Sequence, residues 1–197
     1  MKPVIRTASL LCLLATAVSL QGCAEMVVGG AAAGATVAHD RRTPGTFVDD
    51  ELIELKAAGK LSDDKELAEQ THINVTSYNN IILLSGEVPN ETLRSRAASL
   101  VRPIPKVRQV HNELVIAAPS SLLTRTSDSW ITTKVKTSLF GIKNMPGFDP
   151  TRVKVVSENG TVFLMGIVRR VEADKATDVA RRVAGVQRVV KLFEYLD

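Results

Sequence analysis

The chain has 197 residues, with 25 lysines and arginines against 21 aspartates and glutamates, which gives a formal net charge of +4. Apolar residues make up 45% of the sequence, enough to build the core of one ordinary domain or of two small ones. The nearly balanced charge argues against a nucleic-acid-binding protein.

Residues 1–22 have the features of a secretory signal peptide. Lys2 and Arg6 precede an apolar stretch that ends near Leu20 and is too short to span a bilayer stably. The next residues, Leu20-Gln21-Gly22-Cys23, resemble a bacterial lipobox, in which the cysteine is acylated and the peptide is cut before it. The alternative is ordinary secretory cleavage nearby, with Cys23 left as a free thiol.

The cysteine count favours acylation of Cys23. Cys12 lies inside the signal peptide and is lost with it, so the remaining chain has a single cysteine and cannot form an internal disulfide. An unpaired exposed thiol is a liability in an oxidising compartment unless it is modified. Acyl chains contribute about 0.8 kcal/mol per buried methylene, so several chains would anchor the protein durably. Residues 23–46 then form a Gly/Ala-rich and polar segment, which predicts a flexible tether.

The rest of the chain contains an internal repeat. Residues 73–88, INVTSYNNIILLSGEV, match residues 153–168, VKVVSENGTVFLMGIV, at an offset of 80. The offset is 78 upstream, where Asp50 matches Asp128, and 79 downstream. We therefore expect two copies of one fold unit, at residues 47–117 and 127–197, joined by a linker at 118–126.

The strands of each copy can be predicted from turn residues. Apolar residues alternate on both sides of Asn159-Gly160, which predicts a hairpin because both turn residues need positive φ. Asn79-Asn80 is a permissible turn at the same place in the first copy. Gly86 and Gly166 are expected to end or kink the second strand, where a side chain would crowd a neighbour.

The remaining elements complete the fold class. Apolar residues at intervals of three and four predict second helices at about 91–102 and 172–183, and β-branched runs predict final strands at 107–116 and 186–193. With a leading helix, each copy is expected to be α-β-β-α-β. The predicted class is α+β, with a small three-stranded sheet and two helices on one face of it in each copy.

This arrangement behind a lipobox resembles the dual BON-domain outer-membrane lipoproteins of the DolP (YraP) family. The resemblance rests on the strand endings ILLSG and VFLMG and on SWITTKVK, ENGTVFLMG and GVQRVV in the second copy. It implies a non-enzymatic protein without a cofactor, anchored in the outer membrane and facing the periplasm, that binds anionic phospholipid and supports envelope integrity. In such lipoproteins an Asp directly after the acylated cysteine resembles an inner-membrane retention signal. Position 24 is Ala instead, so the resemblance implies the outer membrane. The first copy departs at Pro103 and Pro105, which predicts a shortened second helix there.

The two copies differ in charge. Residues 23–122 carry 10 basic and 13 acidic side chains, a net charge of −3, whereas residues 123–197 carry 13 and 8, a net charge of +5. The second copy is therefore the one expected to meet an anionic partner.

The leading helix of the second copy is the candidate site. We expect it to begin at an N-cap, Ser127 or Asp128, and to bury Ile131, Val135 and Leu139 on one face. Indole favours the membrane interface, and each lysine near an anionic leaflet adds about 1 kcal/mol. The resemblance also assigns lipid binding to this helix. The predicted phospholipid-binding residues are Trp130, Thr133, Lys134, Lys136, Thr137 and Phe140.

Two other interpretations remain open. Trp130 could instead pack between the two copies as inter-domain core. The helix could also bind protein, as an adaptor that docks an outer-membrane assembly complex. Catalysis, a metal site and a small-molecule substrate are not expected, because His39, His72 and His111 are scattered without metal spacing and GxSxG, HExxH and GxxxxGK[ST] do not occur.

Overall fold

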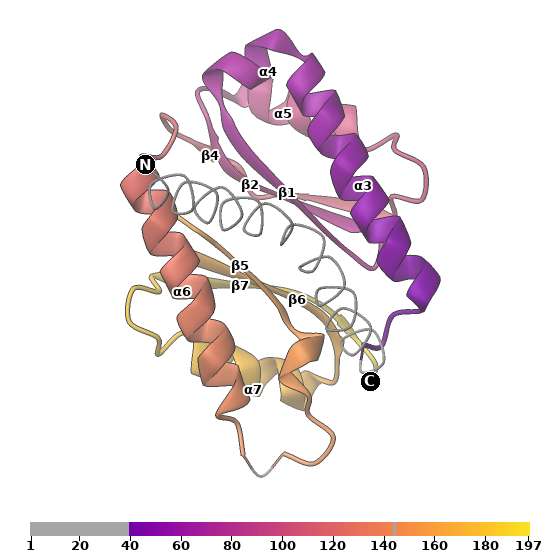
Figure 1. The fold of residues 1–197 in the computed structure, drawn as a ribbon, viewed down its shortest axis with the longest axis vertical. Helices are drawn as coiled ribbons and strands as arrows, with labels where there is room; N and C mark the ends of the chain where they lie inside the picture. The colour runs from indigo at the N-terminus through magenta and orange to yellow at the C-terminus, as the bar shows by residue number, and fades with distance from the viewer. Residues whose placement is uncertain (1–39, 144) are drawn as a thin grey trace, which may run out of the picture. The chain divides into compact units, whose positions relative to one another are not determined.

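The computed structural model describes residues 40–143 and 145–197. The expected signal peptide, Cys23 and most of the expected tether lie outside the described residues. The first copy consists of α3 (Pro44–Asp63), α4 (Lys65–Gln70), β1 (His72–Tyr78), β2 (Ile81–Val88), α5 (Glu91–Val101), β3 (Gln109–Asn112) and β4 (Val115–Ile116). The second consists of α6 (Leu122–Phe140), the 3-10 helix η2 (Pro150–Arg152), β5 (Lys154–Glu158), β6 (Thr161–Val168), α7 (Arg170–Ala180) and β7 (Arg188–Tyr195). The predicted α+β class and element order are confirmed (Figure 1).

Both sheets have the same topology. The first two strands form an antiparallel hairpin, and the last strand pairs in parallel with the second strand, in the orders β1-β2-β3 and β5-β6-β7. The short β4 also pairs in parallel with β2. The hairpin turns lie where the sequence predicted them, since Asn79, Asn80, Asn159 and Gly160 all have positive φ.

The crowding expected at Gly86 and Gly166 is present, but neither glycine ends its strand, because β2 continues to Val88 and β6 to Val168. Gly86 has φ +118°, and a Cβ there would overlap the carbonyl oxygen of His72 on the neighbouring strand. A Cβ at Gly166 would overlap the carbonyl oxygen of Arg152. Any side chain at these positions would therefore push the start of the hairpin away from β2 or β6.

The expected shortening of the second helix in the first copy is wrong. Both α5 and α7 have 11 residues. After α5, Lys106 adopts φ +73°, the left-handed conformation that Gly185 adopts in the second copy. The copies differ in their last strand instead. In the first copy the Asn112 side chain donates to the Arg94 carbonyl oxygen of α5, and its Oδ1 accepts a hydrogen bond from the Leu114 N–H. The predicted strand is split there into β3 and β4.

The expected helix starts are also corrected. The helix α6 begins at Leu122, where the Ser121 side chain accepts a hydrogen bond from the Thr124 N–H, so residues 122–126 of the expected linker are helical. Asp128 does not cap this helix, because it is buried and its carboxylate accepts bonds from the backbone of the β5–β6 turn. In the first copy α3 begins at Pro44, within the expected tether.

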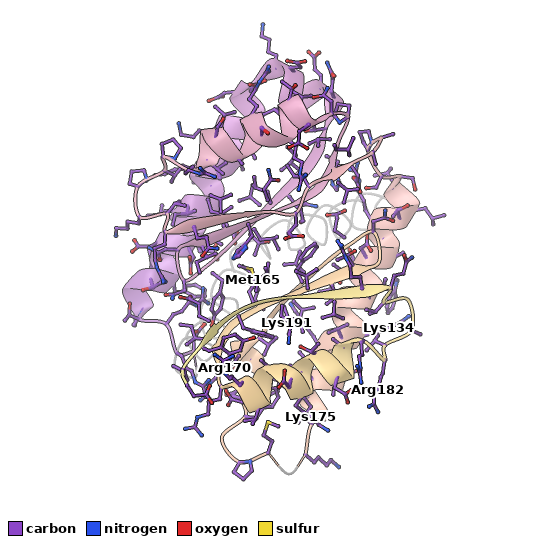
Figure 2. All side chains as sticks on the ribbon, turned by 180° about the vertical axis from the view of Figure 1, so that it is seen from behind. Lys134, Met165, Arg170, Lys175, Arg182 and Lys191 are labelled. Carbon is purple, nitrogen blue, oxygen red and sulfur yellow. The ribbon has the colours of Figure 1, made fainter. Side chains whose placement is uncertain are left out.

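Each sheet is covered on both faces. The helices of each copy pack on one face, around buried residues such as Ile53 and Leu93 in the first copy and Val135 and Leu164 in the second. The opposite faces pack against each other through Tyr78, Ile81, Leu83, Phe163 and Met165. Figure 2 labels Met165 in this layer between the sheets. Burial on both faces explains why the central strands β2 and β6 contain consecutive apolar residues, at 81–84 and 162–165, rather than alternating ones.

None of the helices within residues 40–143 and 145–197 combines the length and the apolarity needed to span a bilayer.

Candidate functional site

The helix α6 buries one face and exposes the other. Ile131, Val135 and Leu139 are buried against the second sheet, as predicted. Trp130 is 63% exposed and Phe140 is 64% exposed. The interpretation of Trp130 as inter-domain core is therefore wrong. The other predicted residues are also exposed, so the structure brings all six to the outer side of one helix: Trp130, Thr133, Lys134, Lys136, Thr137 and Phe140.

Two further apolar residues extend this side of the helix. Leu122 and Leu123 are 78% and 82% exposed. At about 100° per residue they lie on the same side of α6 as Trp130 and Phe140. At 1.5 Å per residue the helix from Leu122 to Phe140 is roughly 27 Å long. The two leucines could not be assigned to the helix from apolar periodicity, because residues 124–129, TRTSDS, contain no apolar side chain. The available signal was Ser121, a residue type that is common at helix N-caps.

We define the α6 surface as these eight exposed residues: Leu122, Leu123, Trp130, Thr133, Lys134, Lys136, Thr137 and Phe140. The only carboxylate of the helix, Asp128, is buried and bonded to the hairpin turn. Lys134 and Lys136 form no ion pair with any residue that the structure describes. The accessible charge of the α6 surface is therefore wholly positive.

The threonine hydroxyls of the α6 surface are already used as donors. Thr133 Oγ1 donates to the Ser129 carbonyl oxygen at 3.0 Å, and Thr137 Oγ1 donates to the Thr133 carbonyl oxygen at 2.9 Å. Both bonds stay within the helix. Each threonine therefore offers a partner a methyl group and an acceptor oxygen rather than a free donor.

The corresponding helix of the first copy, α3, has a different surface. Leu52 stands at the position of Trp130 and is 45% exposed, and Leu55 stands at the position of Thr133 and is 70% exposed. Glu51 is exposed beside them, and Glu54 accepts bonds from the Ser77 N–H and from Lys154. The exposed side of α3 is thus apolar but carries acidic groups. The α6 surface carries no acidic group.

Several arginines of the second copy contact other side chains, unlike Lys134 and Lys136. Arg181 and Arg182 both pair with Asp178 on α7. Arg170 stacks on the ring of Tyr195, with 4.5 Å between Cζ and the ring centroid. Figure 2 shows Arg170 and Arg182 toward opposite ends of α7, so these side chains do not form one cationic cluster.

Comparison with known proteins gives the family. Residues 49–118 and 127–197 each match the BON domain. Outer membrane lipoprotein DolP of Haemophilus influenzae is 40% identical over 185 residues, which is 94% of either chain. A 21 kDa hemolysin of Actinobacillus pleuropneumoniae is 38% identical over 157 residues, 80% of this chain and 79% of the relative. Osmotically-inducible protein Y of Escherichia coli is 28% identical over 160 residues, 80% of this chain and 78% of the relative.

Proposed function

Because the chain belongs to the BON-domain family of outer-membrane lipoproteins, we propose that it binds anionic phospholipid through the α6 surface and supports outer-membrane integrity. It is a non-enzymatic protein of the outer membrane, as its sequence predicted. In this proposal acylated Cys23 holds the chain at the membrane, and the second BON domain contacts the leaflet.

The observation that carries the proposal is the exposure of large apolar side chains on a helix with only positive accessible charge. Trp130 and Phe140 are each more than 60% exposed, and Lys134 and Lys136 lie between or beside them. Aromatic side chains partition into the headgroup region, and lysines are attracted to anionic lipid. A protein partner would not require this combination of aromatic and unneutralised cationic groups.

The expected energies fit a peripheral contact. Burying a large apolar side chain contributes about 1.5–3 kcal/mol, and each lysine near an anionic leaflet contributes about 1 kcal/mol. The sum is modest for a freely diffusing domain. An acyl anchor raises the local concentration of the α6 surface at the bilayer, so a weak contact is sufficient.

The proposal is tested with vesicles and a variant that cannot be acylated. The chain carrying C23S is mixed with vesicles of phosphatidylglycerol or cardiolipin and, separately, with neutral phosphatidylcholine vesicles, and bound protein is measured by co-sedimentation. We expect preferential binding to the anionic vesicles. W130E should weaken that binding by about tenfold or more, because it removes an apolar contact and adds a repelled charge.

The first BON domain supplies the matched control. Leu52 is the exposed counterpart of Trp130 on α3, so L52E introduces the same charge at an equivalent position outside the α6 surface. Binding of L52E should equal that of the parent. The lipid proposal fails if W130E binds anionic vesicles like the parent, or if the parent binds neutral and anionic vesicles equally. Capture of one stoichiometric protein partner that depends on Trp130 would then favour the adaptor.

A further inference from the structure

Three ionisable side chains outside the α6 surface meet between the two sheets. They are His72 on β1, Glu87 on β2 and Glu158 on β5. His72 Nδ1 lies 3.2 Å from Glu87 Oε2 and 3.7 Å from Glu158 Oε1. The side chains of Glu87 and Glu158 are 3% and 7% exposed, and that of His72 is 16% exposed. We call these three residues the His-Glu cluster.

The strand register explains why the His-Glu cluster forms. His72 and Glu87 are directly paired across the β1–β2 hairpin. Residues two apart on a strand share a face, so Glu87 lies on the same face of β2 as Ile81 and Leu83, which pack against the second sheet. Glu158 is the last residue of β5 and comes from that second sheet. The cluster therefore joins the two BON domains.

The positive charge available to the cluster is small. Glu158 accepts a hydrogen bond from the Asn74 side chain at 2.6 Å, and Glu87 accepts one from the Ser120 N–H at 3.1 Å. Arg125 lies beside the cluster, but its guanidinium donates to Ser120 rather than to either carboxylate. Two buried carboxylates beside one imidazole need a further positive charge to be stable when ionised. A divalent cation at this place would offset both the burial of the two carboxylates and the repulsion between them.

The internal repeat provides an independent comparison. At the offset of 80, the counterparts of His72, Glu87 and Glu158 are Arg152, Ile167 and Tyr78. That equivalent place holds cationic groups of the chain itself: Arg152 stands in place of His72, Arg41 donates to the Ile167 carbonyl oxygen at 2.8 Å, and Cζ of Arg42 lies 4.1 Å from the centroid of the Tyr78 ring. No described guanidinium or ammonium group bonds to the carboxylates of the His-Glu cluster in the same way.

The surroundings also offer room and unused polar atoms. A cavity of about 360 Å³ opens beside the cluster and is lined in part by His72, Asn74, Arg125 and Glu158. Ser85, two residues before Glu87 on the same face of β2, is 1% exposed, and its hydroxyl has no hydrogen-bond partner among the described residues. That hydroxyl is therefore available as a hydrogen-bond partner for a polar guest such as a water.

We propose that His72 Nδ1, Glu87 Oε2 and Glu158 Oε1 form a binding site for a divalent transition-metal cation, with Zn²⁺ as the best fit, that ties the two BON domains together. Zinc takes histidine nitrogen and carboxylate oxygen at about 2.0–2.2 Å in tetrahedral geometry, which places its ligand atoms about 3.3 Å apart. The distances from His72 Nδ1 to the two carboxylate oxygens are close to this spacing. Water facing the cavity completes the coordination. Mg²⁺ and Ca²⁺ prefer six or more oxygen ligands, so the imidazole favours zinc.

The test is a titration of the metal-free protein. The full chain without an affinity tag, carrying C12S and C23S so that no thiol competes, is treated with EDTA, dialysed and titrated with ZnCl₂ in a calorimeter. We expect saturable binding of one Zn²⁺ per chain and a rise of several degrees in Tm, because the ion binds only the folded pair of domains. The same concentration of Mg²⁺ or Ca²⁺ should leave Tm unchanged.

Two variants and two controls assign the site. H72Q and E158Q should each weaken Zn²⁺ binding by about tenfold or more, whereas H111Q on β3 and E194Q, another carboxylate that contacts the opposite BON domain, should bind like the parent. A cooperative melting transition in EDTA establishes that each variant is folded. If H72Q is not folded, the Zn²⁺ affinity of E158Q alone tests the site. The proposal is overturned if the parent does not bind Zn²⁺ stoichiometrically or if H72Q and E158Q bind Zn²⁺ like the parent. It is also overturned if Ca²⁺ raises Tm as much as Zn²⁺ does.

Discussion

Asp50 and Asp128 hold the same position in the two BON domains and make the same contact. Each is buried on the first helix of its domain, and its two carboxylate oxygens accept hydrogen bonds from the two backbone N–H groups of the hairpin turn. The N–H donors are Asn79 and Asn80 in the first domain and Asn159 and Gly160 in the second, at 2.7–3.0 Å. This contact fixes the helix against the hairpin.

Replacing either aspartate by alanine should destabilise the protein strongly. D128A leaves two turn amides without their charged acceptor, which we expect to cost roughly 3 kcal/mol. D50A should cost roughly 1–2 kcal/mol more, because Asp50 also accepts bonds from Ser77 and Arg42. Urea denaturation followed by circular dichroism measures both. S129A, on the exposed side of α6, is the control, and a cost for D128A no larger than that of S129A would contradict the role of the contact.

Two glycines should respond to alanine in opposite directions. G86A should destabilise by at least about 3 kcal/mol, since its Cβ would overlap the His72 carbonyl oxygen and the backbone has a positive φ. Gly59 lies inside α3 with open space around it, so G59A should stabilise by about 0.5–1 kcal/mol through helix propensity. The comparison is made by thermal and urea unfolding. Equal effects of the two substitutions would show that the close approach at Gly86 is not constraining.

Stability should fall as the pH drops below about 4.5, in part through Glu172. Burial alone would raise its pKa, but hydrogen bonds from Arg41 and from the Arg169 N–H, with the charges of Arg41 and Arg152, lower it below the usual 4.5. The pKa of Asp40 is lowered in the same sense, because its bonds and ion pair with Arg42 outweigh burial. A lowered carboxyl pKa gives stability that is fully present above the unfolded-state pKa and is lost as the pH falls through the folded-state value.

The measurement for this prediction is Tm against pH from 7 to about 3. The parent should lose stability over the acid part of the range, and E172Q should start lower at neutral pH and lose less. Parallel curves for the two proteins would exclude Glu172 as a contributor.

The leucines at the start of α6 should matter for lipid binding. L122E and L123E each replace an exposed apolar side chain by a carboxylate on the proposed contact side, so binding to anionic vesicles should fall by about tenfold. V48E on α3 is the matched control, since Val48 is also exposed near the start of the leading helix. Vesicle co-sedimentation provides the readout. If both leucine variants bind like V48E, the lipid contact is confined to the part of α6 around Trp130.

The parts of this structure that follow from local sequence could be predicted. The hairpin turns follow from Asn79-Asn80 and Asn159-Gly160, and the buried stripe of α6 follows from the spacing of Ile131, Val135 and Leu139. The exposure of the six candidate residues follows from that stripe. Their binding of lipid remains a prediction.

Other features depend on contacts between distant residues and could not be predicted. Asp128 looks like a helix cap in the sequence, but the hairpin turn takes its carboxylate. His72, Glu87 and Glu158 meet only because two sheets pack face to face, and no spacing in the sequence encodes that packing. Lys106 shows that a left-handed position need not hold glycine when its side chain gains an ion pair with Asp49.

The packing of the sheets gives this protein two opposite exteriors, each made by the helices of one BON domain. Since the helix-free faces meet in the middle, the helices of the first BON domain and those of the second cover opposite exteriors. When α6 lies on a leaflet, the exposed Val48, Leu52 and Leu55 of α3 are turned toward the aqueous periplasm. In the proposed arrangement the duplicated fold would therefore connect a lipid contact on one exterior with a second exterior that stays accessible to other components of the envelope.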